Sequence, residues 1–61
     1  MGVSRDERRT ELARLTKKQL IAKSRIGIRR PDGQIVELLD TEGWTKDELI
    51  ARMLDIQFPR P

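Results

Sequence analysis

The chain carries one helix-start pattern twice, first as Leu15-Thr16-Lys17-Lys18-Gln19-Leu20-Ile21-Ala22-Lys23 and again as Trp44-Thr45-Lys46-Asp47-Glu48-Leu49-Ile50-Ala51-Arg52. In each copy the Thr hydroxyl can accept a hydrogen bond from the amide three residues on. The Gln or Glu at that position can accept one from the Thr amide, which closes a capping box. The apolar residue before the Thr can pack on the Leu inside the helix as a hydrophobic staple. The pattern therefore predicts helices over residues 17–25 and 46–55.

Between these helices, residues 26–39 change to an alternating pattern and contain the turn sequence Pro31-Asp32-Gly33. Proline presets the second position of a type I turn, aspartate suits the third, and glycine can adopt the left-handed conformation that follows. This combination predicts a hairpin with a three-residue loop and a bulge at Gly33, in which Arg30 pairs with Gln34.

In that register Ile28 faces Val36 and Ile26 faces Leu38, so that four apolar side chains share one face of the hairpin. The opposite face then carries the two remaining apolar residues, Ile35 and Leu39. A helix or a second subunit could cover them, and one of the two could belong to a bend.

Residues 1–14 are highly charged and offer few apolar side chains for docking. Ser4 and Glu7 have the spacing of a third capping box, and Asp6 suits the positive end of a helix dipole. The segment is interpreted as a solvated helix or a frayed arm, with one bent helix over residues 5–24 as an alternative.

The last helix has an apolar stripe, and the tail after it contains two prolines. The residue before a proline is pushed to an extended conformation, so the helix cannot continue past Phe58, which we expect to lie on the core. Altogether the sequence predicts the α+β class, as a small single domain over residues 1–61. It would comprise a charged N-terminal helix or arm over 1–14, a folded region over 15–55 with the hairpin and the amphipathic C-terminal helix, and a tail over 56–61. The expected core is Leu15, Leu20, Ile21, Ile26, Ile28, Val36, Leu38, Trp44, Leu49, Ile50, Met53 and Leu54.

Composition excludes several function classes. The 61 residues include no cysteine and no histidine, so a thiolate metal site, a Cys nucleophile and a His general base are ruled out. No glycine-rich phosphate loop follows a strand, and the adjacent Asp47 and Glu48 are explained as helix-start residues. We therefore predict a protein that is not an enzyme and has no cofactor or metal. No apolar run approaches the ~18 residues of a membrane span, and the absence of cysteine favours a cytoplasmic location.

The charge is distributed unevenly over the two halves of the chain. Residues 1–30 hold ten Lys and Arg against three Asp and Glu, and residues 31–61 hold three against seven. The two halves could simply attract each other, within one chain or across a dimer. Alternatively, the basic half faces nucleic acid, because arginine forks and lysine ammonium groups suit phosphates. The predicted nucleic-acid-binding residues are Lys17, Lys18, Lys23, Arg25, Arg29 and Arg30, and the preferred ligand is DNA rather than RNA.

A second hypothesis is a protein-binding adaptor or inhibitor of a host protein, which would use surplus apolar residues. Its predicted partner-binding residues are Ile35, Leu39 and Phe58. A third hypothesis is a structural subunit of an oligomer, and a homodimer through Ile35 and Leu39 or through the last helix is expected in any case, because an apolar strand face would otherwise lie in water.

The doubled helix start also resembles the two helices of the helix–extended–helix modules, the SAP and Rho N-terminal group, over residues 15–28 and 44–54. The resemblance implies a small nucleic-acid-binding domain in which Lys17, Lys18, Lys23, Arg25 and Lys46 contact phosphates. That family joins its helices by a short extended loop, whereas a hairpin-like stretch separates them here. The compact size without cysteine is also similar to small phage-encoded proteins.

Overall fold

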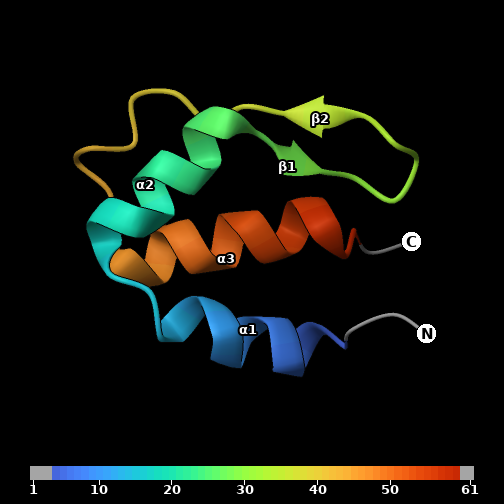
Figure 1. Ribbon diagram of the computed structural model, residues 1–61, viewed down its shortest axis with the longest axis horizontal. Helices are drawn as coiled ribbons and strands as arrows, with labels where there is room; N and C mark the ends of the chain where they lie inside the picture. The colour runs from blue at the N-terminus through green and yellow to red at the C-terminus, as the bar shows by residue number, and fades with distance from the viewer. Residues whose placement is uncertain (1–3, 60–61) are drawn as a thin grey trace.

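A computed structural model describes residues 4–59, which form three helices and one antiparallel hairpin. The order is α1 (Arg5–Ala13), α2 (Lys17–Ile26), β1 (Ile28–Arg29), β2 (Ile35–Val36) and α3 (Lys46–Gln57). Helix α3 is the central element, with α1 on one side and α2 and the hairpin on the other (Figure 1). The predicted α+β class is confirmed.

Both predicted capping boxes form. The Thr16 hydroxyl accepts a hydrogen bond from the Gln19 amide at 3.1 Å, and the Gln19 side chain accepts one from the Thr16 amide at 2.9 Å. Thr45 and Glu48 make the same pair of bonds, both at 3.1 Å. Each box satisfies amides that a helix start would otherwise leave without a partner. Helices α2 and α3 consequently begin where the repeated pattern places them.

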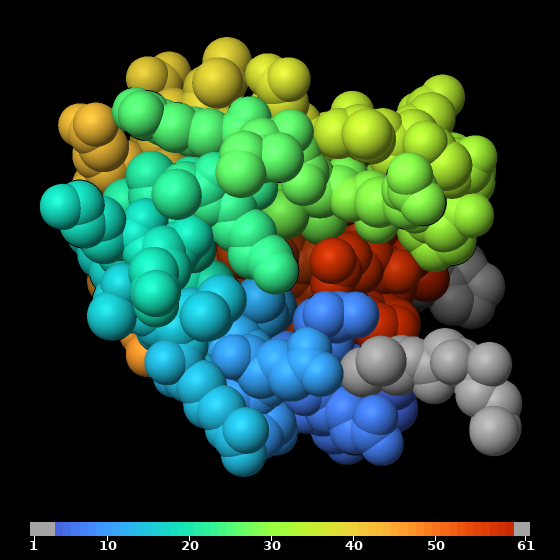
Figure 2. Space-filling view, in the orientation of Figure 1, coloured from blue at the N-terminus to red at the C-terminus, as the bar shows by residue number. Residues whose placement is uncertain are grey.

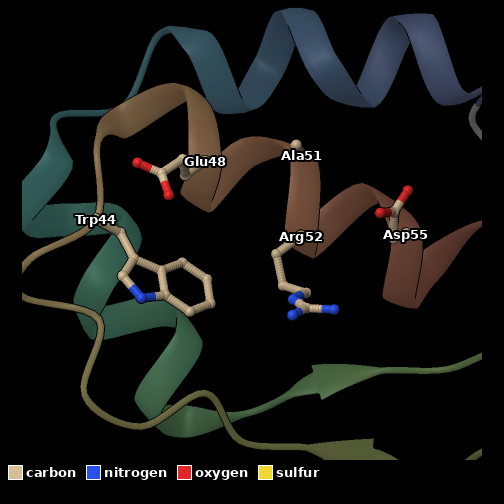
Figure 3. A pocket seen from close by; sticks show the side chains of 5 residues that line it. All are labelled: Trp44, Glu48, Ala51, Arg52 and Asp55. Atoms are coloured by element: carbon tan, nitrogen blue, oxygen red, sulfur yellow. The ribbon is translucent and has the colours of Figure 1, made fainter.

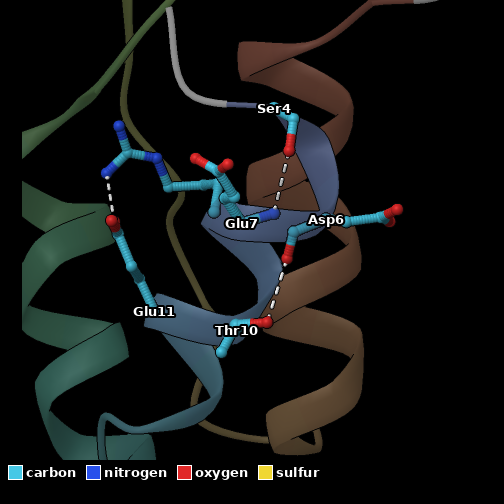
Figure 4. A network of polar contacts seen from close by, with 6 residues as sticks. Ser4, Asp6, Glu7, Thr10 and Glu11 are labelled. Carbon is cyan, nitrogen blue, oxygen red and sulfur yellow. Dashed lines mark hydrogen bonds and ion pairs between the residues drawn. The ribbon is translucent and has the colours of Figure 1, made fainter.

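Helix α1 is a separate helix that docks on α3. The Ser4 hydroxyl accepts from the Glu7 amide, and Arg8 pairs with Glu11 at 2.9 Å one turn along (Figure 4). Within residues 4–59 only this half of the predicted Ser4–Glu7 box is present. Leu12 is buried, which anchors α1 to the core. Because α1 ends at Ala13 and α2 begins at Lys17, the alternative of one helix over residues 5–24 is wrong.

The hairpin has the predicted register around its turn. Ile28 pairs with Val36, Arg29 pairs with Ile35, and the Arg30 amide donates to the Gln34 carbonyl at 2.7 Å. Gly33 has the expected positive φ of 93°.

The prediction that Ile26 faces Leu38 is wrong. Ile26 is the last residue of α2, and Gly27 follows it with a φ of 124°, which turns the chain into β1. The Leu38 amide instead donates to the Ser24 carbonyl at 3.1 Å. Ile26 is 81% exposed and does not belong to the core.

The core lies where α3 meets its three neighbours. Of the expected core residues, Leu20, Ile28 and the four apolar residues of the α3 stripe are buried. The staple residues Leu15 and Trp44 are half-buried and pack against them, as do Ile21, Leu38, Ile56 and Phe58. Val36 is half-buried. Leu12 is also buried, although it was left out of the expected core because α1 as a whole offers so little apolar surface.

Candidate nucleic-acid interface

The predicted basic residues lie on one continuous stretch of chain. Residues 14–30 hold seven Lys and Arg and no Asp or Glu. Helix α2 supplies the middle of this stretch and lies at the surface of the molecule, with α3 behind it (Figure 2). All six predicted residues are exposed, namely Lys17, Lys18, Lys23, Arg25, Arg29 and Arg30. The outer side of α2 and the start of the hairpin therefore form a surface with cations and no carboxylate of its own.

The helical repeat divides the cations of α2 into two groups. Lys18 and Arg25 are seven residues apart, which is almost two full turns, so they share one face at about 10 Å along the axis. Lys23 lies about 140° around the helix from Lys18. The buried Leu20 and Ser24 occupy the side between them that meets α3. The helix thus presents cations on both flanks of its outer surface.

Arg29 ends β1 and Arg30 follows it, and the two side chains lie on opposite faces of the hairpin, because neighbouring residues of an extended chain alternate. Ile28 is buried, so Arg29 points to the solvent face, next to Ile35. Arg30 lies on the other face, where it lines a hollow of about 250 Å³ together with Arg52 and Asp55 of α3. Arg29 and Arg30 therefore face different sides of the hairpin.

Several of the predicted cations have partners within the chain. The Lys17 ammonium donates to the Glu42 carbonyl at 3.1 Å, and Arg25 lies 3.6 Å from the Glu42 carboxylate. Arg30 lies 3.9 Å from the Asp32 carboxylate. The Arg25 and Glu42 side chains are 66% and 81% exposed, and such ion pairs contribute about 0–1 kcal/mol. A phosphate could replace these carboxylates at little cost.

The remaining three cations form no ion pair among the described residues. Within residues 4–59 no ion pair reaches Lys18, Lys23 or Arg29. These three side chains have the solvent exposure and the freedom that phosphate contacts require, and they span both flanks of α2 and the solvent face of the hairpin.

Glu42 is a feature that the sequence did not indicate. It stands in the loop before α3, where Asp40 has a φ of 57° and Thr41 is buried. These loop residues and Arg25 line a hollow of about 300 Å³. Because seventeen residues separate Arg25 from Glu42, no local pattern could have predicted that a carboxylate borders the basic surface.

The Trp44 side chain packs within the fold. It is half-buried against the core, and the Arg52 guanidinium lies 5.9 Å from the centre of its ring (Figure 3). The two side chains line a hollow of about 280 Å³ with Glu48, Ala51 and Asp55. The predicted staple role agrees with this packing, and the ring offers little free surface for stacking on a base.

The predicted partner-binding residues differ in their accessibility. Ile35 is 59% exposed and Leu39 is 69% exposed. Phe58 is half-buried and packs against the core, where it forms the C-cap of α3 before Pro59. Of these three predicted residues, Ile35 and Leu39 present a large apolar surface to solvent and Phe58 does not.

The described chain contains neither a metal site nor a membrane-crossing helix. Over residues 4–59 no three acidic side chains converge in a way that could hold a metal ion. In the same region every helix is too short or too polar to cross a bilayer.

Comparison with known proteins gives no relative from which a function could be transferred. No family model matches the chain, and neither a curated protein nor a solved structure matches it. The resemblance to helix–extended–helix modules therefore stays a prediction from the sequence.

Proposed function

We propose that this protein is a small DNA-binding module that holds the phosphate backbone with the outer side of α2 and the solvent face of β1. The observation that carries the proposal is the acid-free basic stretch over residues 14–30, which is exposed along α2. Lys18, Lys23 and Arg29 make the principal phosphate contacts. Arg25 joins them once the nucleic acid displaces its exposed pairing with Glu42.

Duplex DNA is the preferred ligand for two reasons. An exposed helix fits the major groove, which is about 12 Å wide, and cations on both of its flanks can reach the two bordering phosphate strands. Single-strand binding instead relies on exposed aromatic rings, and both aromatic residues of this chain pack against the core. Phosphate contacts position a protein on DNA without reading its sequence, so the binding should be largely independent of base sequence.

The test is a titration of fluorescently labelled duplex and single-stranded oligonucleotides over about 50 to 200 mM salt. Each phosphate contact contributes about −0.9 to the slope of log K against log salt for duplex DNA. The variants K18Q, K23Q and R29Q should each weaken binding and make the slope shallower by about that amount.

Arg9→Gln is the matched control, because it removes the same charge from α1, on the side of α3 away from α2 (Figure 1). It should leave the slope unchanged. The proposal fails if the wild-type protein binds no nucleic acid at low salt, or if R9Q weakens binding as much as the three variants of the basic surface.

A further inference from the structure

The outer edge of the hairpin has backbone groups without a strand partner. The two-stranded sheet consists of β1 and β2 alone, and β1 is the strand that contacts α3. In an antiparallel hairpin, pairs that exchange backbone hydrogen bonds alternate with pairs that do not. Arg30 and Gln34 form a hydrogen-bonded pair, so the next pair, Arg29 and Ile35, is not hydrogen-bonded, and Ile28 and Val36 are again a hydrogen-bonded pair. The amide and carbonyl of Ile35 therefore point away from β1, toward the open edge, and the alternation continues to Glu37.

The same edge carries apolar side chains in water. Ile35 lies on the solvent face of β2, and Leu39 follows three residues after the end of that strand. They are 59% and 69% exposed. An unpaired strand edge with exposed aliphatic side chains is a template for pairing with another strand, unless charges protect it.

We infer that this edge pairs with the β2 edge of a second copy of the chain, which forms a four-stranded antiparallel sheet across a twofold axis. A twofold interface requires one patch to be complementary to itself, and a strand that pairs antiparallel with its own copy meets this requirement. The inference concerns self-association and is independent of the proposed DNA binding.

Charge selects the register of this pairing. If the twofold axis passed between the two copies of Glu37, their carboxylates would lie opposite each other, which is destabilising. An axis at Ile35 instead places the two Ile35 side chains side by side and sets each Glu37 opposite Gly33 of the other copy. Space around Gly33 is open, since an added Cβ would meet nothing within 4 Å, so the Glu37 side chain can be accommodated there. The structure therefore favours the axis at Ile35.

The pairing should be reversible. A short strand and a few aliphatic side chains bury much less than the roughly 1,600 Å² of a standard stable interface. We expect dissociation at low micromolar concentration and a dimer at about 100 μM or above.

Sedimentation and cysteine cross-linking test the inference together. Ile35→Lys places charges opposite each other at the axis and should weaken dimerisation by about tenfold or more. Ile26→Lys is the matched control, because it makes the same substitution at a more exposed isoleucine outside the strand. It should change the dimer dissociation constant by less than about twofold.

Since the chain has no cysteine, single substitutions report the register directly. Hydrogen-bonded antiparallel partners have Cα atoms about 5.5 Å apart, a separation that a disulfide can span. I35C should therefore oxidise rapidly to a covalent dimer, and E37C and I26C should do so slowly. I35C also keeps a small apolar side chain, so it tests the pairing even where I35K perturbs folding. A chain that sediments as a monomer at every concentration, a dimer that I35K leaves intact, or faster cross-linking through E37C than through I35C would overturn the inference.

Discussion

Ile35 lies directly over Gly27, and its Cγ2 atom fills the space that a Cβ atom on residue 27 would occupy. Gly27 also has a φ of 124°, a backbone conformation that residues other than glycine rarely adopt. Two independent restrictions thus require glycine where α2 turns into β1. We predict that Gly27→Ala destabilises the protein by about 3 kcal/mol, since backbone strain and steric overlap each cost about 1–3 kcal/mol. Urea unfolding at low micromolar concentration measures this change.

Gly33→Ala is the control for the strain alone. Gly33 also has a positive φ, but an alanine Cβ there has open space around it, so the expected cost is about 1 kcal/mol. The double variant G27A/I35A should be more stable than the sum of its single changes predicts, because Ile35→Ala removes the overlapping methyl group. Equal costs at the two glycines would contradict this account.

The two capping boxes should contribute about equally to the free energy of unfolding. Thr16→Ala and Thr45→Ala each remove the hydroxyl that accepts from the third helical amide, and each should cost about 1 kcal/mol. Thr10→Ala is the matched control, because the Thr10 hydroxyl only donates to the Asp6 carbonyl within α1. It should be neutral or slightly stabilising, since alanine is the better helix former. Equilibrium unfolding of the three variants gives the comparison, and equal losses at all three positions would refute it.

Helix α1 should depend on a single apolar anchor. Leu12→Ala removes its buried side chain and should cost about 2–4 kcal/mol. We expect amide exchange over residues 5–13 to accelerate more than exchange in α3. Leu39→Ala, at a mostly exposed leucine, should change stability by less than about 0.5 kcal/mol. Unprotected α1 amides in the wild-type protein would show that the helix is not docked.

The Glu42 carboxylate should oppose DNA binding. Glu42→Gln frees Arg25 from its ion pair and keeps the backbone carbonyl that accepts from Lys17. We expect affinity for duplex DNA to rise by about twofold at 100 mM salt, with stability changed by less than about 0.5 kcal/mol. Glu11→Gln makes the same charge change in α1, where Glu11 pairs with Arg8. Screening over about 10 Å should leave its effect smaller, so a larger gain with E11Q would count against the assigned surface.

Local sequence chemistry was sufficient to predict most of the fold. Thr16 and Thr45 specify helix starts through bonds to residues three positions away, and Pro31-Asp32-Gly33 specifies the turn in the same local way. The errors occur where a distant contact decides. Ile26 alternates with Ile28, which predicts a strand. In the structure the Ser24 carbonyl accepts from the Leu38 amide, and Ile26 is the last residue of α2. Leu12 is the only apolar side chain of α1 that α3 buries completely, which no pattern within α1 indicates.

The basic surface was predictable in its residues but not in its shape. The six cations are exposed as expected, yet strand alternation sends Arg30 toward α3 while Arg29 faces solvent. Glu42 reaches Arg25 only through the path of the loop before α3, so it could not be recognised as a neighbour from the sequence.

The central position of α3 also constrains how the protein can fold during synthesis. Helices α1 and α2 and strand β1 all pack on α3, which the ribosome makes last of the described elements. Short helices are marginal in water on their own, so the earlier elements have no stable partner while α3 is still in the exit tunnel. We therefore expect the nascent chain to stay unfolded until residues 46–57 have emerged, and then to fold in one step.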